Sequence, residues 1–427
     1  MSGVLVAASV VAVSAVPATA RDSERRAIHD EWVVSVGDSY ISGEGGRWAG
    51  NTNLSPTMTD AGGPGAYNDA GSTETIERCH RSTSAEIHIG VAHSLNLACS
   101  GAQTSTFTSS EGYFKPGLDF SDNGAGRKGQ ALMLQEFAAT HNVRMVQVSI
   151  GGNNFGFASI VSKCLVNFST STILAPNYCS DDPDVLANFT PERIATVTAE
   201  IQGALANVEK AMTNAGYTPN SYTIMIQTYP SPLPRGDGFR YGETFAERHT
   251  VGGCETWNRD ADWSNDFAAA TINSAVRNAA AAIGPPIGVL DLSTAFNGRR
   301  LCEKGVGTLE EQGLLSWTEP GASDKTEWIQ RIRVETGVTG TPYFIQESVH
   351  PNYWGQLALR NCVRQAYNAG NPRGGTCTRL DGVSSVGEPN MSFAAAPGPQ
   401  APGPVTPVPT TAPGAFPIPP GELPATL

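Results

Sequence analysis

The sequence predicts an α/β fold, a three-layer α/β/α sandwich around a central, mostly parallel sheet. Short runs rich in valine, isoleucine, leucine and methionine alternate with longer segments of helical pattern. This alternation is typical of parallel strands joined by helices that cover both faces of a sheet. With 427 residues and 40% hydrophobic composition, the chain is long enough to bury a sizeable core.

The expected elements lie between residues 32 and 369. The strands are short apolar runs, expected at 32–37, 94–98, 143–150, 221–228 and 287–292. The helices are expected at 128–141, 191–215, 262–283 and 352–369, and the second begins with Pro191 in its first turn. Parallel sheets bind ligands beyond the carboxyl ends of their strands, so reactive side chains are expected where the strands stop.

Polar residues with catalytic potential lie at the ends of three predicted elements. The first strand stops at Gly37-Asp38-Ser39, where little side-chain bulk hinders presentation of the Ser39 hydroxyl to a cleft. The third strand ends at Gly151-Gly152-Asn153-Asn154, and Glu347-Ser348-Val349-His350-Pro351-Asn352 lies at the start of the last helix. Each segment alone is compatible with a plain turn. Together they supply a nucleophile, an amide donor and a histidine.

These segments resemble the sequence blocks of the SGNH hydrolases, also called GDSL-type esterases and lipases. The serine block is Gly37-Asp38-Ser39, and the glycine block is Ala98-Cys99-Ser100-Gly101-Ala102. The asparagine block ends with Asn153-Asn154, and the histidine block contains His350. Order and spacing agree with the family, and with its secreted actinobacterial members, from about residue 31 to 370. The resemblance implies the flavodoxin-like SGNH fold.

The resemblance also assigns the catalytic roles. Ser39 would attack an ester carbonyl, and His350 would be the general base, because neutral imidazole with a pKa of about 6.5 suits this proton transfer. The backbone N–H groups of Ser39 and Gly101 and the amide of Asn153 would stabilise the oxyanion. Glu347, where aspartate is commoner, would orient the histidine. A backbone carbonyl, as in some secreted relatives, is the alternative.

Other residues near these blocks have simpler expected roles. Asp38 is expected to stabilise the turn before the serine. Asn154 replaces the aspartate common in the family and is expected to change only local hydrogen bonding. Residues 43–46 lack the Gly-Lys-Ser/Thr ending of a phosphate loop, so a flexible active-site loop is expected. Phe155 and Phe157 are candidates for an acyl pocket or for the core. The remaining histidines are expected at the surface or in ordinary packing: His29, His80, His88, His93, His141 and His249.

One catalytic domain is expected from residue 31 to about 380, because the four blocks must converge. Residues 1–20 combine an apolar segment with Ala18-Thr19-Ala20, which is typical of a signal peptide. The missing basic start leaves an uncleaved anchor as the alternative. Residues 388–427 contain 12 of the 29 prolines and are expected to form a disordered tail, with a spacer or cell-wall contact as its candidate role.

Eight cysteines without Cys-x-x-Cys spacing indicate disulfides in an oxidising compartment rather than zinc. Their connectivity is open from the sequence alone. The family's preference for sequence-local bridges implies the pairs Cys79–Cys99, Cys164–Cys179, Cys254–Cys302 and Cys362–Cys377. A net charge of −12 without a basic run disfavours nucleic acid and anionic surfaces as partners. No metal-binding spacing occurs, and the expected mechanism requires no cofactor.

The sequence therefore predicts an exported or envelope-associated serine esterase or lipase that acts on small-molecule or lipid esters. Acyl transfer to an alcohol or sugar would use the same residues. A catalytically inactive wall-binding module displayed by the tail is the alternative outside enzymology. Such a module has no need of Ser39, Gly101, Asn153 and His350 together, so the enzyme is favoured. Acyl length, the alcohol portion and the oligomeric state leave no signature in the sequence.

Overall fold

The computed structural model describes residues 30–333 and 345–396. In this part of the chain, seven strands form one sheet in the order β2-β1-β5-β6-β7-β8-β9. Neighbouring strands are parallel except β8 and β9. The strands of this sheet are β1 (Glu31–Gly37), β2 (His93–Asn96), β5 (Asn142–Ser149), β6 (Thr223–Gln227), β7 (Ile287–Asp291), β8 (Gly375–Val383) and β9 (Pro389–Ala395). A separate antiparallel pair consists of β3 (Phe107–Thr108) and β4 (Phe114–Lys115).

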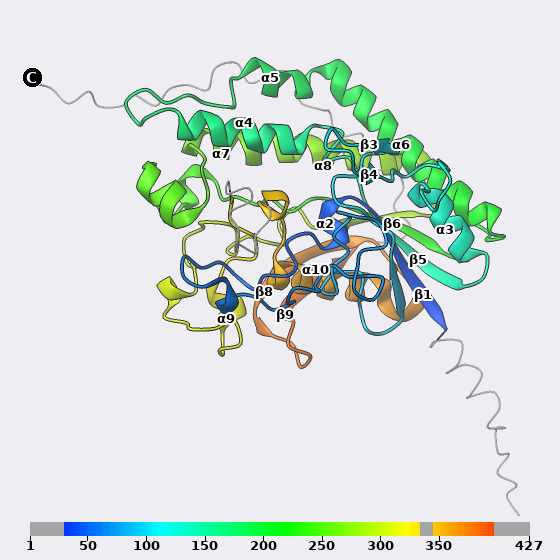
Figure 1. The fold of residues 1–427 in the computed structure, drawn as a ribbon. Coiled ribbons are helices and arrows are strands. Elements are labelled where there is room, and N and C mark those ends of the chain that lie inside the picture. Colours follow the sequence, from blue (N-terminus) through cyan, green and yellow to red (C-terminus); the bar gives the residue numbers. More distant parts are fainter. Residues whose placement is uncertain (1–29, 334–344, 397–427) are drawn as a thin grey trace, which may run out of the picture.

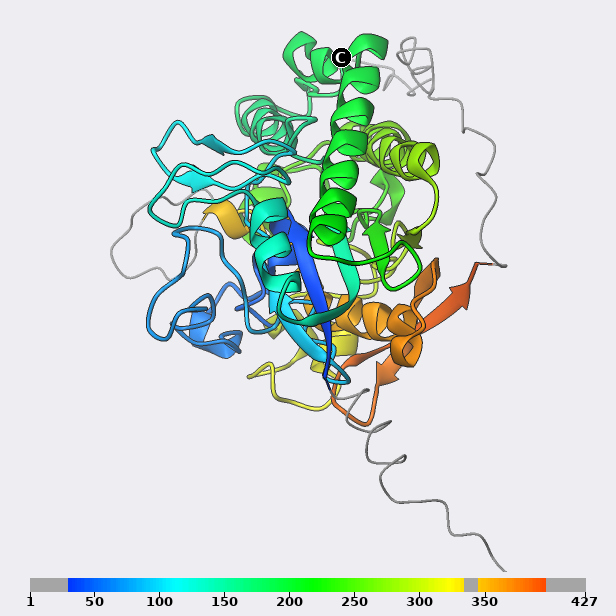
Figure 2. The same cartoon turned by 90° about the vertical axis from the view of Figure 1, so that its right-hand side faces the viewer.

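Helices cover both faces of the sheet (Figures 1 and 2), which confirms the predicted three-layer class. The upper layer in Figure 1 contains α3 (Gln130–Ala138), α4 (Phe157–Ser169), α6 (Pro191–Asn214) and α8 (Ala270–Ile283). The lower layer contains α10 (Tyr353–Tyr367). The shorter α-helices are α2 (Ser39–Ser42), α5 (Pro183–Leu186), α7 (Asn258–Trp263) and α9 (Ala322–Lys325). Wider π-helical turns occupy Ala246–Gly252 and Ser264–Ala269, and short 3₁₀ turns include Ala187–Phe189 and Ile345–Glu347.

The central strands contribute to two hydrophobic clusters because successive residues point to opposite faces. Val34 and Ile226 pack in the cluster that contains Leu205 of α6. Their neighbours Val33 and Met225 pack in the cluster that contains residues of α10. Full burial of such a side chain stabilises the fold by about 1.5–3 kcal/mol. The strands thus hold both helical layers and fix the carboxyl edge of the sheet.

The structure agrees with the predicted elements up to small shifts at their ends, with one difference in the second half of the chain. The predicted helix 262–283 is composed of the end of α7, the π-helical turn Ser264–Ala269 and α8. Helix α4 and strands β8 and β9 were not predicted. The expected domain end at about 380 and tail start at 388 are corrected by β9, which pairs with β8 up to Ala395. The expected signal segment and the rest of the tail lie outside the described residues.

All eight cysteines are paired as the family resemblance implied. The Cys79–Cys99 bridge fixes the segment that leads to Gly101, and Cys164–Cys179 links the middle of α4 to the segment before α5. Bridges of this kind stabilise a fold by about 2–4 kcal/mol each, chiefly through the unfolded state. Within residues 30–333 and 345–396, no helix has the length and apolar character needed to cross a membrane.

A buried carboxyl group makes the stability of this fold depend on pH. Glu86 has no exposed surface, and its backbone N–H donates to Oε1 of Gln356 in α10 over 3.1 Å. Burial raises the pKa of Glu86 to about 8, against the lowering effect of the Gln227 amide. Because the folded-state pKa is raised, the stability that this carboxyl contributes is fully present below about pH 4.5. It is lost as the pH rises through about 8.

We predict that Glu86→Gln becomes increasingly stable relative to the parent between about pH 5 and pH 9, by at least about 1 kcal/mol, because the amide never ionises. Urea denaturation of both proteins across this range measures the difference in unfolding free energy. Parallel pH profiles for the two proteins would contradict the assignment of a buried, neutral carboxyl group.

Candidate active site

The backbone at the end of β1 places Ser39 at the carboxyl edge of the sheet. Gly37 has φ +139°, and a Cβ on it would lie 1.9 Å from the carbonyl oxygen of Ser149, so only glycine fits there. The next residue, Asp38, donates its backbone N–H to the same Ser149 oxygen over 2.8 Å. Its side chain accepts from the Tyr40 N–H and caps α2, the helix that Ser39 begins. The predicted turn-stabilising role of Asp38 is confirmed.

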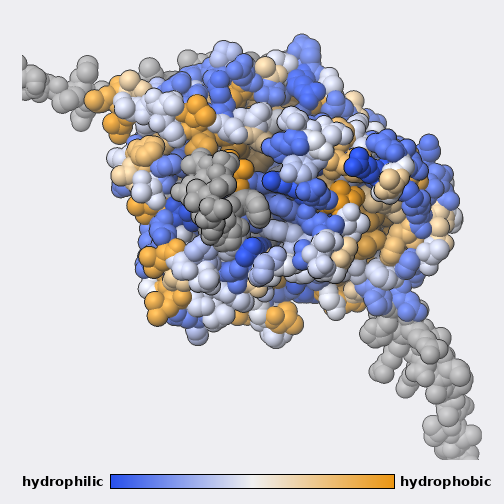
Figure 3. Space-filling model, viewed as in Figure 1, coloured by the Kyte–Doolittle hydropathy of each residue, from blue (hydrophilic) through white to orange (hydrophobic). Residues whose placement is uncertain are grey.

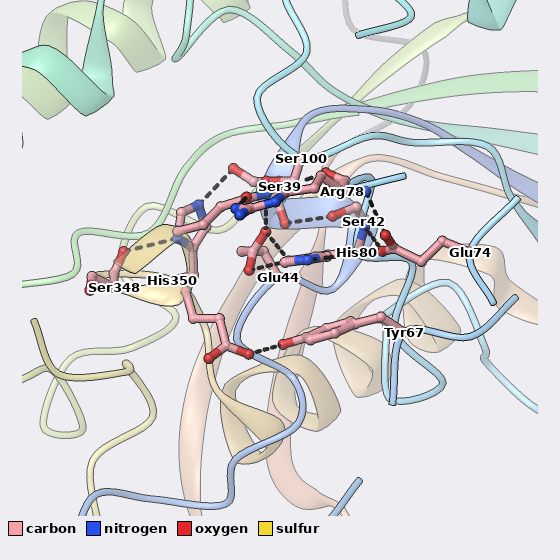
Figure 4. Close-up of polar contacts among 12 residues, drawn as sticks. Ser39, Ser42, Glu44, Tyr67, Glu74, Arg78, His80, Ser100, Ser348 and His350 are labelled. Atoms are coloured by element: carbon pink, nitrogen blue, oxygen red, sulfur yellow. Dashed lines mark hydrogen bonds and ion pairs between the residues drawn. The ribbon is translucent and has the colours of Figure 1, made fainter. Parts of the chain in front are cut away.

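His350 reaches Ser39 from the segment between Ile345–Glu347 and α10. Its Nε2 lies 2.7 Å from the Ser39 Oγ, and its Nδ1 lies 2.9 Å from the carbonyl oxygen of Ser348 (Figure 4). This pattern suits the tautomer in which Nδ1–H donates to the carbonyl and Nε2 accepts from the serine hydroxyl. Both side chains are largely buried, with 6% of Ser39 and 7% of His350 exposed. The structure therefore brings together the predicted nucleophile and the predicted base, which are 311 residues apart.

Glu347 does not occupy the predicted position beside the imidazole. Its Oε2 accepts from the Trp48 indole N–H over 2.8 Å, and its Oε1 accepts from the Tyr67 hydroxyl. The backbone explains the difference, because Val349 has φ +64°, an unusual conformation for a β-branched residue. This turn directs the Ser348 carbonyl toward Nδ1 of His350. The expectation that Glu347 orients the histidine is corrected in favour of the backbone-carbonyl alternative.

The predicted oxyanion donors lie on segments that meet beside Ser39. The Cys99 N–H donates to the Gly37 carbonyl over 3.0 Å, which holds the glycine block against the end of β1. Gly101 has φ +78°, a conformation that glycine adopts without strain. The Asn153 amide donates to the Ala102 carbonyl over 2.9 Å, so it contacts the same block. Asn153 also lines a cavity together with Ser39.

The neighbouring Asn154 has a local structural role, as expected. Its amide donates over 2.8 Å to Thr104 Oγ1 and over 2.8 Å to Glu200 Oε2, and its oxygen accepts from the Thr104 N–H. These contacts tie the asparagine block to the segment just after the glycine block and to α6. The Asn153 side chain, in contrast, lines the cavity beside Ser39.

Two buried charged residues beside the site were not singled out from the sequence. Glu44 is completely buried, and its two oxygens lie 2.8 and 2.9 Å from Nδ1 of His80. Burial would raise the pKa of Glu44, but the His80 imidazolium lowers it to about 2. Burial would lower the pKa of His80, but Glu44 raises it above its ordinary value. In the sequence, the only indication of this ion pair was a charged residue, Glu44, within the glycine-rich run 43–46.

A cavity of about 110 Å³ opens beside Ser39. It passes beneath α4 and α8, and Asp38, Ser39 and Asn153 lie among its lining residues. Most of its lining is apolar, including Phe157, Ile160, Phe189, Leu233, Trp263 and Ile272. Phe157 thus lines this cavity, whereas Phe155 packs in the core. Hydrophilic residues predominate on the face seen in Figure 3, so the apolar lining contrasts with the surrounding surface.

The described ranges contain no group of three or more histidine, cysteine, aspartate or glutamate residues arranged to hold a metal ion. The site combines a serine hydroxyl in contact with an imidazole, an amide at the same edge of the sheet and an apolar cavity. Burial lowers the pKa of His350, and the Glu44 carboxylate opposes this effect. This arrangement can remove a proton from the serine as it attacks a carbonyl carbon.

Comparison with known proteins gives only distant similarities. No family model matches the chain, and no curated protein matches it. Among solved structures, the chain is similar to an extracellular lipase from Streptomyces rimosus, with 19% identity, 76% of this chain and 94% of that chain covered, and a TM-score of 0.40. It is also similar to phospholipase A1 from Streptomyces albidoflavus NA297, with 21% identity, the same coverage and a TM-score of 0.39. A carbohydrate acetylesterase from Sinorhizobium meliloti shares 10% identity over 61% of this chain and 83% of that chain, with a TM-score of 0.25.

Proposed function

We propose that this protein is an exported serine ester hydrolase of the SGNH type. The observation that carries the proposal is the 2.7 Å contact between the Ser39 Oγ and Nε2 of His350 beside an apolar cavity. A hydroxyl in contact with a neutral imidazole is the arrangement that activates serine as a nucleophile. The four sequence blocks that resemble the SGNH hydrolases supply the residues of this site.

In the proposed mechanism, the Ser39 Oγ attacks the carbonyl carbon of the ester while His350 takes the hydroxyl proton on Nε2. The resulting imidazolium keeps its Nδ1–H directed at the Ser348 carbonyl. It then gives the Nε2 proton to the departing alcohol oxygen as the C–O bond breaks, which leaves an acyl-enzyme. Water attacks the acyl carbon in the second half, and His350 transfers the water proton back to the Ser39 oxygen.

The negative charge of each tetrahedral intermediate needs fixed hydrogen-bond donors. We assign this role to the N–H groups of Ser39 and Gly101 and to the amide of Asn153. Support comes from the hydrogen bonds that hold the glycine block on the end of β1 and Asn153 on the glycine block. The Asn153 amide has two N–H donors and uses one of them on the Ala102 carbonyl, so the other would be available for the oxyanion.

The cavity supports an apolar acyl group as the substrate portion bound beside Ser39. Its aromatic and aliphatic walls favour a hydrocarbon chain through removal of apolar surface from water, by about 25 cal/mol per Å². Export is supported by the four disulfides, which persist in oxidising compartments, and by the signal-like segment at residues 1–20.

We predict that Ser39→Ala and His350→Ala each lower turnover of p-nitrophenyl esters by more than about 10³-fold, because the two residues transfer one proton between them. The double variant should be no worse than either single variant. Initial rates and circular dichroism of all three purified variants test this expectation. A folded Ser39→Ala protein that keeps more than about a tenth of the parent turnover would exclude Ser39 as the nucleophile.

We also predict that Ala268→Trp removes activity on long acyl chains while activity on p-nitrophenyl acetate is kept. Ala268 is buried on the cavity wall, and an indole there would fill the space that a chain needs. A loss of at least about tenfold in the ratio of octanoate to acetate kcat/KM is expected, equivalent to about 1.4 kcal/mol. Ala270→Trp is the control, because Ala270 is exposed and does not line this cavity. Equal ratios for both variants would place the acyl chain elsewhere.

A further inference from the structure

In the proposed mechanism, the positive charge that forms on His350 needs a nearby negative charge to stabilise it. His350 becomes positively charged in a largely buried position, and burial disfavours its charged form. Its Nδ1 partner is the carbonyl of Ser348, which selects the tautomer but carries no net charge. In a full serine triad, a carboxylate fulfils both tasks. Glu347 is turned toward Trp48 and Tyr67.

Glu44 is a fully buried carboxylate with several hydrogen-bond partners near the catalytic pair. Its oxygens contact Nδ1 of His80, and its Oε2 also accepts from the Gln346 amide over 2.9 Å. Figure 4 shows the carboxylate between His80 and the Ser39–His350 pair. The same Gln346 amide donates to Ser100 Oγ over 2.8 Å, which ties Glu44 to the glycine block.

The loop that carries Glu44 packs against both residues of the catalytic pair. The Glu44 N–H donates to the Ser39 carbonyl over 3.2 Å. At the next residue, a Cβ on Gly45 would lie 3.3 Å from the Cβ of His350 and 3.1 Å from the carbonyl oxygen of Pro351. Glycine therefore allows this loop to approach the histidine closely. The position of the Glu44 charge relative to the imidazole is fixed by these contacts.

The charges around His350 have opposing effects on its pKa. After burial, which lowers the pKa, Glu44 has the largest effect and raises it, while His80 lowers it by less. Tyr40 of α2 faces the imidazole with ring centres 5.4 Å apart, and the backbone of Glu347 also favours the charged form. Glu44 itself stays ionised in the working pH range, because its pKa lies at about 2.

We propose that Glu44 is a positioning residue that acts through His350, supplying the negative charge of the third triad member while the Ser348 carbonyl supplies the orienting hydrogen bond. The two tasks that one carboxylate performs in a full triad are then divided between a backbone group and a buried ion pair. This inference rests on the proposed function and extends it to a residue of the loop 43–46.

The test is the pH dependence of ester hydrolysis by Glu44→Gln. Removal of the charge lowers the pKa of His350, so the acid limb of kcat/KM should move to lower pH. Turnover at neutral pH should fall at least about tenfold with KM little changed, because the imidazolium forms only during reaction. Glu44→Asp keeps the charge and should keep the acid limb in place. An active Glu44→Gln enzyme with an unmoved acid limb and turnover within about threefold of the parent would overturn the proposal.

Glu347→Gln is the matched control, since it neutralises a second buried carboxylate of the same cluster whose oxygens face Trp48 and Tyr67. Its acid limb should stay where the parent has it, and an equal shift in both variants would overturn the assignment to Glu44.

If Glu44→Gln fails to fold, Glu44→Gln/His80→Gln removes the buried pair without leaving one charge unpaired. The acid limb of kcat/KM for this double variant should still move to lower pH, by less than expected for Glu44→Gln. An unmoved acid limb would overturn the proposal. The Ser39→Ala variant distinguishes failure of the Glu44 proposal from failure of the proposed function. If Ser39→Ala remained active, the proposed function itself would be refuted.

Discussion

The site depends on one hydrogen bond, between the Ser39 hydroxyl and Nε2 of His350, which joins segments 311 residues apart. Everything that positions these two atoms is backbone or buried side chain. Gly37 lets β1 pass against Ser149, and Asp38 caps the short helix that begins with the serine. On the other side, Asn352 caps α10 by accepting from the N–H groups of Trp354 and Gly355. A site built from strand and helix ends is rigid because the sheet and both helical layers fix those ends.

A second constraint is the cost of burying charge around this hydrogen bond. Glu44, His80 and Glu347 are all largely buried, and each carboxylate has specific partners. An unpaired charge in such a position would cost several kcal/mol, whereas paired charges of fixed geometry are tolerated. The ring of Tyr67 stacks on His80 with centres 4.4 Å apart while its hydroxyl contacts Glu347, so Tyr67 links Glu347 to the Glu44–His80 pair. The buried residues that pair with one another here therefore include Glu44, the residue proposed to stabilise the charge on His350.

The sequence was sufficient for the fold class and for the residues that meet at the sheet edge, because both follow from local patterns. Apolar runs mark β1 and β5, and the blocks that end them carry Ser39 and Asn153. The partner of His350 could not be found in this way. Its orientation depends on the positive φ of Val349, and the positions of Glu44 and His80 depend on loop contacts between distant segments. Strand β9 was missed because it begins at Pro389 and runs into a proline-rich segment that suggested a tail, whereas pairing with β8 provides its backbone partners.

The formation of a covalent acyl-enzyme on Ser39 can be tested by covalent labelling of this serine. The protein would be incubated with an alkyl fluorophosphonate, which leaves a stable phosphonyl group on an activated serine, and then measured by intact-protein and peptide mass spectrometry. The acyl-enzyme mechanism predicts one adduct per chain, located on the peptide that contains Ser39, and much slower labelling in His350→Ala because the base is missing. Labelling of a different serine, or an unlabelled Ser39 in a protein that still hydrolyses esters, would contradict it.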